Sequence, residues 1–148
     1  MTTNSYEAKV TQEIIKKLKT VTDVTKYVGT RIYPAHPATI QDVNYPAISI
    51  HVQPSEGQAI SEAGMETIDM QIDFWFRSSN EAGGNTWDDL YECFAAALKE
   101  LHNNAGWDNT VGINVLMMQN ISRGPALFED DTKIMHYQSK FRTRGTLQ

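Results

Sequence analysis

Hydrophobic residues recur every four positions near the beginning of the chain. From Val10 to Leu18 they keep one direction while lysines occupy the others, a pattern typical of an amphipathic helix over residues 5–19. The lysines near its end suit the helix dipole. Thr20–Asp23 has the spacing of a capping box, which predicts a short second helix ending near Gly29.

Alternation of apolar and polar residues then replaces the helical period. A short extended piece, 31–33, precedes a predicted strand at 46–54. A second strand at 66–77 alternates without interruption from Ile68 to Phe76, as expected of an antiparallel strand covered on one face. The connection at 55–64 is much longer than a hairpin turn needs.

The second half of the chain repeats this order of helix and paired strands. Thr86–Asp89 predicts another capping box, at the beginning of a helix over 86–102. Strands follow at 112–122 and 133–144, joined by a second overlong loop at 123–132.

The order helix, helix, strand pair, helix, strand pair predicts an α+β fold. We expect a single, mostly antiparallel four-stranded sheet, made of two hairpins joined by a crossover helix, with the helices packed on one face. The length of 148 residues and the 41% hydrophobic content suit one domain over 1–148, with residues 1–5 flexible.

One face of the predicted sheet points away from the helices and still carries apolar side chains. Trp75, Leu116 and Met118 alternate with the residues assigned to the core. An isolated subunit rarely exposes such a group, so we expect another subunit or protein to cover this face. Its charged residues are expected to pair with one another, either within the same sheet or across that boundary. They are Asp69, Asp73, Lys140, Arg142 and Arg144.

The two overlong loops are further candidates for contacts between subunits, since turning a hairpin needs only a few residues. The loop residues that we expect in these contacts are Glu56, Glu62, Arg123, Phe128, Glu129, Asp130 and Asp131.

Composition narrows the function classes. Thirteen lysines and arginines against eighteen acidic residues give a formal charge of −5, which argues against a dedicated nucleic-acid binder. The single Cys93 excludes an internal disulfide or a cysteine metal cluster. We expect neither a signal peptide nor a membrane span, because no apolar stretch approaches 20 residues.

The candidates for catalysis are weak. Asp69 and Asp73 lie about 13 Å apart along a strand, too far for a catalytic carboxylate pair. The four histidines lack ligand spacing, although His51 and His136 are candidate neighbours in the sheet. We therefore expect no catalytic residue, cofactor or metal. The alternative is a small α+β enzyme or ligand-binding domain whose pocket on the polar sheet face uses His51, His136, Asp69 and Trp75.

Four segments carry a family resemblance. They are VTKYVGTRIYP at 24–34, YPAISI at 45–50, QIDFWF at 71–76 and YQSKFR at 137–142. Their order around an amphipathic helix resembles the tail completion or tail terminator proteins of long-tailed bacteriophages, over nearly the whole chain from Val10 to Arg144.

The resemblance implies a structural virion protein of the tail or neck, assembled in the host cytoplasm. Such proteins form a ring, usually a hexamer, that caps the finished tail tube and ends its elongation. The implied partners are further copies of the chain, the tail tube protein and a neck or head-completion protein. Genomic DNA passes through without specific binding, and no membrane is involved. Another virion part, such as a head-tail connector or a tube subunit, is the related alternative.

Overall fold

The structure is a computed structural model that describes residues 5–34, 44–53, 65–78, 84–102 and 113–147. Its helices are α1 (Tyr6–Leu18), α2 (Thr22–Val28) and α3 (Trp87–Leu101). Its strands are β1 (Ile32–Tyr33), β2 (Ala47–Val52), β3 (Met65–Arg77), β4 (Ile113–Glu129) and β5 (Ile134–Leu147).

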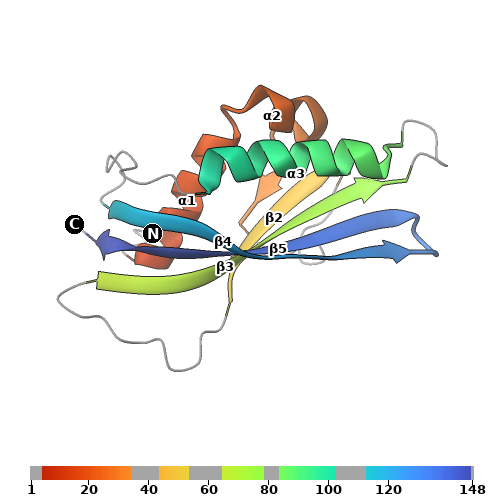
Figure 1. The fold of residues 1–148 in the computed structure, drawn as a ribbon. Coiled ribbons are helices and arrows are strands. Elements are labelled where there is room, and N and C mark those ends of the chain that lie inside the picture. The colour runs from red at the N-terminus through yellow and green to blue at the C-terminus, as the bar shows by residue number, and fades with distance from the viewer. Residues whose placement is uncertain (1–4, 35–43, 54–64, 79–83, 103–112, 148) are drawn as a thin grey trace.

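The strands form one sheet in the order β1-β2-β3-β5-β4, and the three helices lie on one side of it (Figure 1). The predicted α+β layers, the two hairpins and the crossover helix are present. The prediction of four strands was wrong by one, because the short piece at Ile32–Tyr33 pairs in parallel with β2. The backbone N–H of Ile48 donates to the carbonyl of Arg31 at 3.0 Å and begins this pairing.

The helix boundaries follow from their caps. Ser5 caps α1 by accepting from the Ala8 N–H, and the predicted capping box of α3 is complete between Thr86 and Asp89. The box predicted at Thr20–Asp23 was wrong. Val21 is the N-cap of α2, and the Thr20 hydroxyl donates to the carbonyl of Lys17 in the preceding helix.

The core lies between the helices and the inward face of the sheet. The alternating residues of β3 from Ile68 to Phe76 are buried there, as predicted. Near the end of β5 the Tyr6 hydroxyl of α1 lies 2.9 Å from the hydroxyl of Thr143. Burial raises the pKa of Tyr6 to about 12. Gly145 leaves room for this tyrosine, since a Cβ there would lie 2.6 Å from its hydroxyl oxygen.

β4 departs from simple alternation. Its pairing with β5 shifts register between Val115 and Met117, so that Leu116 lies in a bulge. The extra residue reverses the alternation that follows it. Met118 consequently belongs to the core and is fully buried, which corrects its predicted place on the opposite face, whereas Leu116 is 45% exposed.

The loop predicted at 123–132 was also wrong. Residues up to Glu129 continue β4, and only 130–133 form the turn. A further register shift between Arg123 and Ala126 accommodates Gly124 and Pro125. The hairpin therefore continues without a loop to the right-hand end of the molecule in Figure 1. We term residues 121–136 the arm.

Candidate assembly surface

The sheet face turned away from the helices, termed the open face, holds the five charged residues that the sequence pattern placed on it. The register pairs Asp69 with Arg142 and Thr67 with Arg144, and it pairs Gln71 with Lys140. Directly opposed residues of an antiparallel pair share a face. The acidic residues of β3 and the basic residues of β5 are therefore neighbours within one subunit.

One of these pairs forms an ion pair within the subunit. The Arg142 guanidinium donates to both carboxylate oxygens of Asp69, at 2.9 and 3.1 Å. This bidentate contact raises the pKa of Arg142. Asp69 and Arg142 thus satisfy each other within one sheet, the first of the two expected pairings, and not across a subunit boundary.

Trp75 lies on the open face but is not exposed. Its ring stacks on His136 at 3.6 Å between centroids, and its indole N–H donates to the Ser49 hydroxyl at 2.9 Å. Only 6% of Trp75 is accessible. The subunit itself therefore buries this side chain, which corrects the expectation that an assembly partner must cover it.

A row of polar side chains crosses the open face beside Trp75. The Gln53 amide donates to Gln71, whose own amide donates to both carboxylate oxygens of Asp73 at 2.9 Å. Asp73 is fully buried, and its carboxylate lies 3.5 Å from the His136 ring nitrogen Nε2. Buried polar groups require such partners. The row explains how Asp73 is accommodated without lying at a boundary.

The pocket considered as the enzyme alternative is not assembled. His51 pairs across the sheet with Gln71, whereas His136 pairs with Trp75, so the two histidines are not neighbours. Asp69 is engaged by Arg142. In the portion of the chain that the structure describes, no three His, Cys, Asp or Glu residues are grouped to hold a metal ion.

Cys93 is fully buried in the core, where burial raises its thiol pKa to about 12. The thiolate is the reactive form of cysteine, so this side chain is chemically inert at neutral pH.

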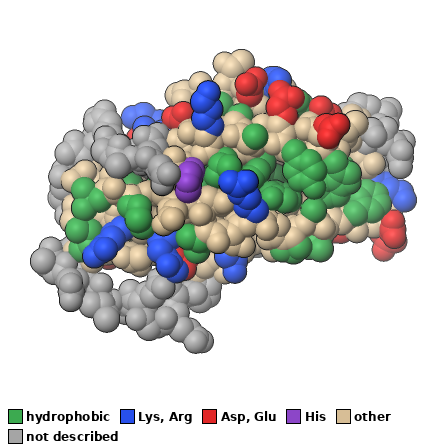
Figure 2. All heavy atoms as spheres, in the orientation of Figure 1, with side chains coloured by type: hydrophobic (Ala, Val, Ile, Leu, Met, Phe, Trp, Pro, Cys, Tyr) green, Lys and Arg blue, Asp and Glu red, His purple; other side chains and the backbone are tan. Residues whose placement is uncertain are grey.

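The arm carries the exposed apolar surface. Leu127 and Phe128 are adjacent in sequence and extend to opposite faces of the hairpin, and they are 44% and 43% accessible. Phe128 was among the contact residues expected from the sequence, whereas Leu127 was not. Figure 2 shows hydrophobic side chains gathered in the right half of the molecule, with acidic side chains at the right-hand end.

The turn of the arm is charged and exposed. Glu129, Asp130 and Asp131 all face solvent, and Glu129 accepts from the hydroxyl of Thr132 at 2.9 Å. Lys133 lies 6.0 Å from the centre of the Phe128 ring. Arg123 packs back on the Phe94 ring of α3, which joins the base of the arm to the helical layer. The expected contact residues Glu56 and Glu62 lie outside the described residues.

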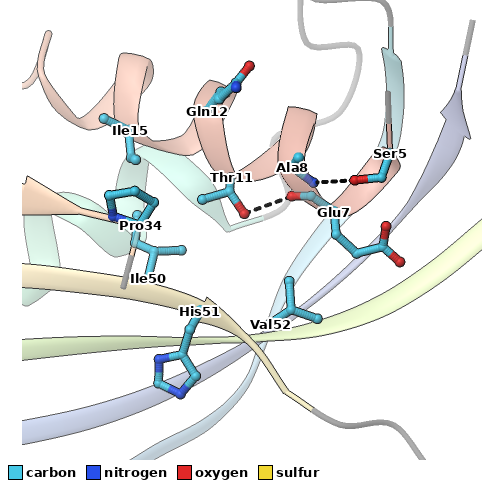
Figure 3. A pocket seen from close by; sticks show the side chains of 10 residues that line it. All are labelled: Ser5, Glu7, Ala8, Thr11, Gln12, Ile15, Pro34, Ile50, His51 and Val52. Carbon is cyan, nitrogen blue, oxygen red and sulfur yellow. Dashed lines mark hydrogen bonds between the residues drawn. The ribbon is translucent and has the colours of Figure 1, made fainter. Parts of the chain in front are cut away.

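A groove of about 420 Å³ separates α1 from β2 (Figure 3). Ile15 from the helix and Ile50 and Val52 from the strand give it an apolar lining, while the His51 ring points away from the helix. Its polar groups are partly used within α1, where the Thr11 hydroxyl donates to the carbonyl of Glu7. The described residues that line the groove form no arrangement of groups suited to catalysis.

Comparison with known proteins gives a likeness in structure. No family model matches the sequence, and no curated protein matches it either. The fold is similar to that of a chain in a solved structure described as the virion of a native gene transfer agent (GTA) particle, with a TM-score of 0.71 and 17% sequence identity. The match covers 96% of this chain and 99% of that chain. At this identity the likeness shows a shared fold.

Within the described residues, none of the helices has both the length and the apolar character needed to cross a bilayer.

Proposed function

We propose that this chain is a structural virion protein whose subunits form a ring, with six copies as the expected number. The ring caps the tail tube, ends its elongation and presents the surface to which the neck or head is joined. The observation that carries the proposal is the end-to-end likeness in fold to a virion chain, which covers 96% of this chain and 99% of that chain. A whole subunit, rather than a shared fragment, has this architecture.

The surface of the molecule supports a role in assembly. The large hydrophobic side chains Leu116, Ile121, Leu127 and Phe128 are 40–45% exposed, and all four lie on β4. Exposed apolar groups gathered on one element are typical of protein contact sites. The expected partners are other copies of the chain, the tail tube protein and a neck or head-completion protein.

The charge of the chain suits a passage for DNA. With a net charge of −5, a subunit gains little from binding phosphates, so genomic DNA passes through the proposed ring without specific contacts.

The test combines the purified chain with the tube protein of the same particle. We expect the mass in solution to match a ring, negative-stain images to show it, and growing tubes to stop with the ring at one end. Incorporation along the length of the tube would make the chain a tube subunit. Binding to the head vertex without any effect on tube length would make it a connector. A monomer that alters neither tubes nor heads would refute the proposal.

A further inference from the structure

The β4–β5 hairpin has an exposed apolar patch at each of its two ends. At the turn end, termed the tip, the apolar side chains are Leu127 on the open face and Phe128 on the opposite face, each more than 40% accessible. At the opposite end, termed the root, it is Leu116, which is 45% accessible, with the half-buried Met117 beside it. The two patches belong to the same strand, β4.

The two ends carry opposite charge. The tip has the exposed carboxylates of Glu129, Asp130 and Asp131. The root has the exposed cation Arg144 on β5, directly opposite Met117 in the register, and the exposed Lys140 lies four residues nearer the tip, opposite Ser122. No carboxylate among the described residues forms an ion pair with either cation, because Asp69 engages Arg142 instead. Figure 2 shows both acidic and basic side chains at the right-hand end of the molecule and several basic ones at the lower left.

The tip and the root of one subunit cannot meet. Met117 and Phe128 lie opposite Arg144 and Met135 of β5, which are nine residues apart, and this corresponds to roughly 30 Å. Figure 1 shows the turn of the hairpin at one end of the molecule and the beginning of β4 at the other. Any contact between these complementary ends must therefore join two copies of the chain.

We propose that the tip of each subunit docks on the root of the next copy. Leu127 and Phe128 pack against Leu116 and Met117, and the tip carboxylates pair with Lys140 and Arg144. Because two different patches meet, the contact is head to tail, and it closes into a ring when the rotation between neighbours permits. This inference rests on the proposed ring and names the surfaces that build it.

Both halves of this contact lie on one polypeptide, which favours a second copy over a foreign protein as the occupant. Opposite charge at the two ends also opposes the competing symmetric contacts, since tip against tip brings carboxylates together and root against root brings cations together.

Crosslinking tests the pairing directly. Two variants, Asp130→Cys and Arg144→Cys, are made separately, and the buried native Cys93 stays silent toward a short bifunctional maleimide. We expect crosslinked dimers only when the two variants are mixed, and a ladder up to the closed ring when one chain carries both changes. Lys99→Cys, an exposed position on α3, is the control and should not link to Arg144→Cys.

The reaction is run on rings in solution or, where the chain stays monomeric, on the tube ends that it caps. Linkage within Asp130→Cys alone would show a symmetric tip contact and overturn the inference. Rings or caps that form without any tip-to-root linkage would also overturn it while leaving the proposed function intact. A chain that neither forms rings nor caps tubes would refute both this inference and the proposed function.

Charge reversal gives a second, independent measurement. One variant carries Asp130→Lys and Asp131→Lys, and the other carries Lys140→Glu and Arg144→Glu. Each variant alone should lose rings, because like charges then meet at every contact. An equimolar mixture should regain them, since reversed tips meet reversed roots and unchanged tips meet unchanged roots. Loss without recovery in the mixture, with both variants folded, would contradict the proposed pairing.

Discussion

The root and the arm of the β4–β5 hairpin share the same two strands but differ in what covers them. In the root, Val115, Met118 and Phe141 are buried under the helical layer. In the arm, Ile121, Leu127 and Phe128 are each at least 40% exposed. The hydrogen-bonded ladder continues through both parts. The helix-covered side of the root therefore stabilises the subunit, whereas the arm and the exposed side of the root, with Leu116, are available for contact.

Phe141 and Phe128 give the strongest test of this difference in burial, because they are the same residue type on the same hairpin. Phe141→Ala should lower the free energy of unfolding by about 3–5 kcal/mol, because it empties a fully buried site. Phe128→Ala should change it by less than about 0.5 kcal/mol, since that ring is 43% exposed. Urea unfolding of both variants measures the difference, and similar losses would place the arm in the folding core.

Gly145 tests how tightly the root is packed against α1. A Cβ at this position would overlap the carbonyl oxygen of Asn114 and crowd the Tyr6 hydroxyl. We expect Gly145→Ala to cost about 1–3 kcal/mol of unfolding free energy, the usual range for an overpacked core. Combining it with Tyr6→Phe, which removes the crowded oxygen, should recover part of the loss. An unchanged midpoint of unfolding for Gly145→Ala would mean that α1 does not lie close to β5.

Trp75 and Ser49 extend the comparison to the open face. Ser49→Ala should cost about 1 kcal/mol, because it leaves the buried indole N–H without its acceptor. In a Trp75→Phe background the same change should cost less, because the donor is already gone. A double-mutant cycle in urea measures this coupling. Strict additivity would contradict the hydrogen bond and the burial of Trp75.

The smallest expected effect concerns the beginning of α3, the helix that covers the hairpin. The Thr86 backbone N–H is the main cause that lowers the pKa of Asp89 below its ordinary value. A carboxyl whose pKa is lowered by folding contributes stability above its unfolded pKa of about 3.9, and the contribution is lost as the pH falls through the folded value. Wild type should therefore lose slightly more stability than Asp89→Asn between about pH 5 and 2. Thermal unfolding midpoints measured over that pH range check this, and an equal decrease for the two proteins would refute it.

Alternation predicted β3 well because this strand has a helix-covered face along its length. The same argument failed on β4, where a single extra residue at Leu116 reverses the pattern. The unbroken apolar run from Val115 to Met118 shows that alternation fails there, but it does not show which residue is the extra one. Met118 was therefore assigned to the wrong face, although its burial satisfies the same preference for covering apolar groups.

The loop predicted at 123–132 was wrong for a different reason, which concerns Gly124 and Pro125. Proline interrupts strands in the middle of a sheet, because it lacks the N–H that a neighbour requires. β4 lies at the edge of the sheet, so a proline within a register shift is tolerated there. Strand order is a property of the whole chain, and the local sequence does not contain it.

The sequence predicted which charged residues lie on the open face, but not which of them form ion pairs with one another. The sequence placed Asp69 and Arg142 on one face but left open whether they pair within the sheet or with another subunit. Only the adjacency of β3 and β5 shows that the two residues meet within the chain. That adjacency joins residues 73 positions apart, beyond the reach of any local pattern.

The position of β3 between β2 and β5 also has a consequence for how the chain acquires its structure during synthesis. β2 is available to β3 early, whereas β5 emerges only after α3 and β4 have been made. Until then one long edge of β3 has no strand beside it, and such edges attract other chains. Pairings between distant residues also slow folding. We therefore expect the nascent subunit to be most prone to misassociation late in translation, just before its last strand arrives.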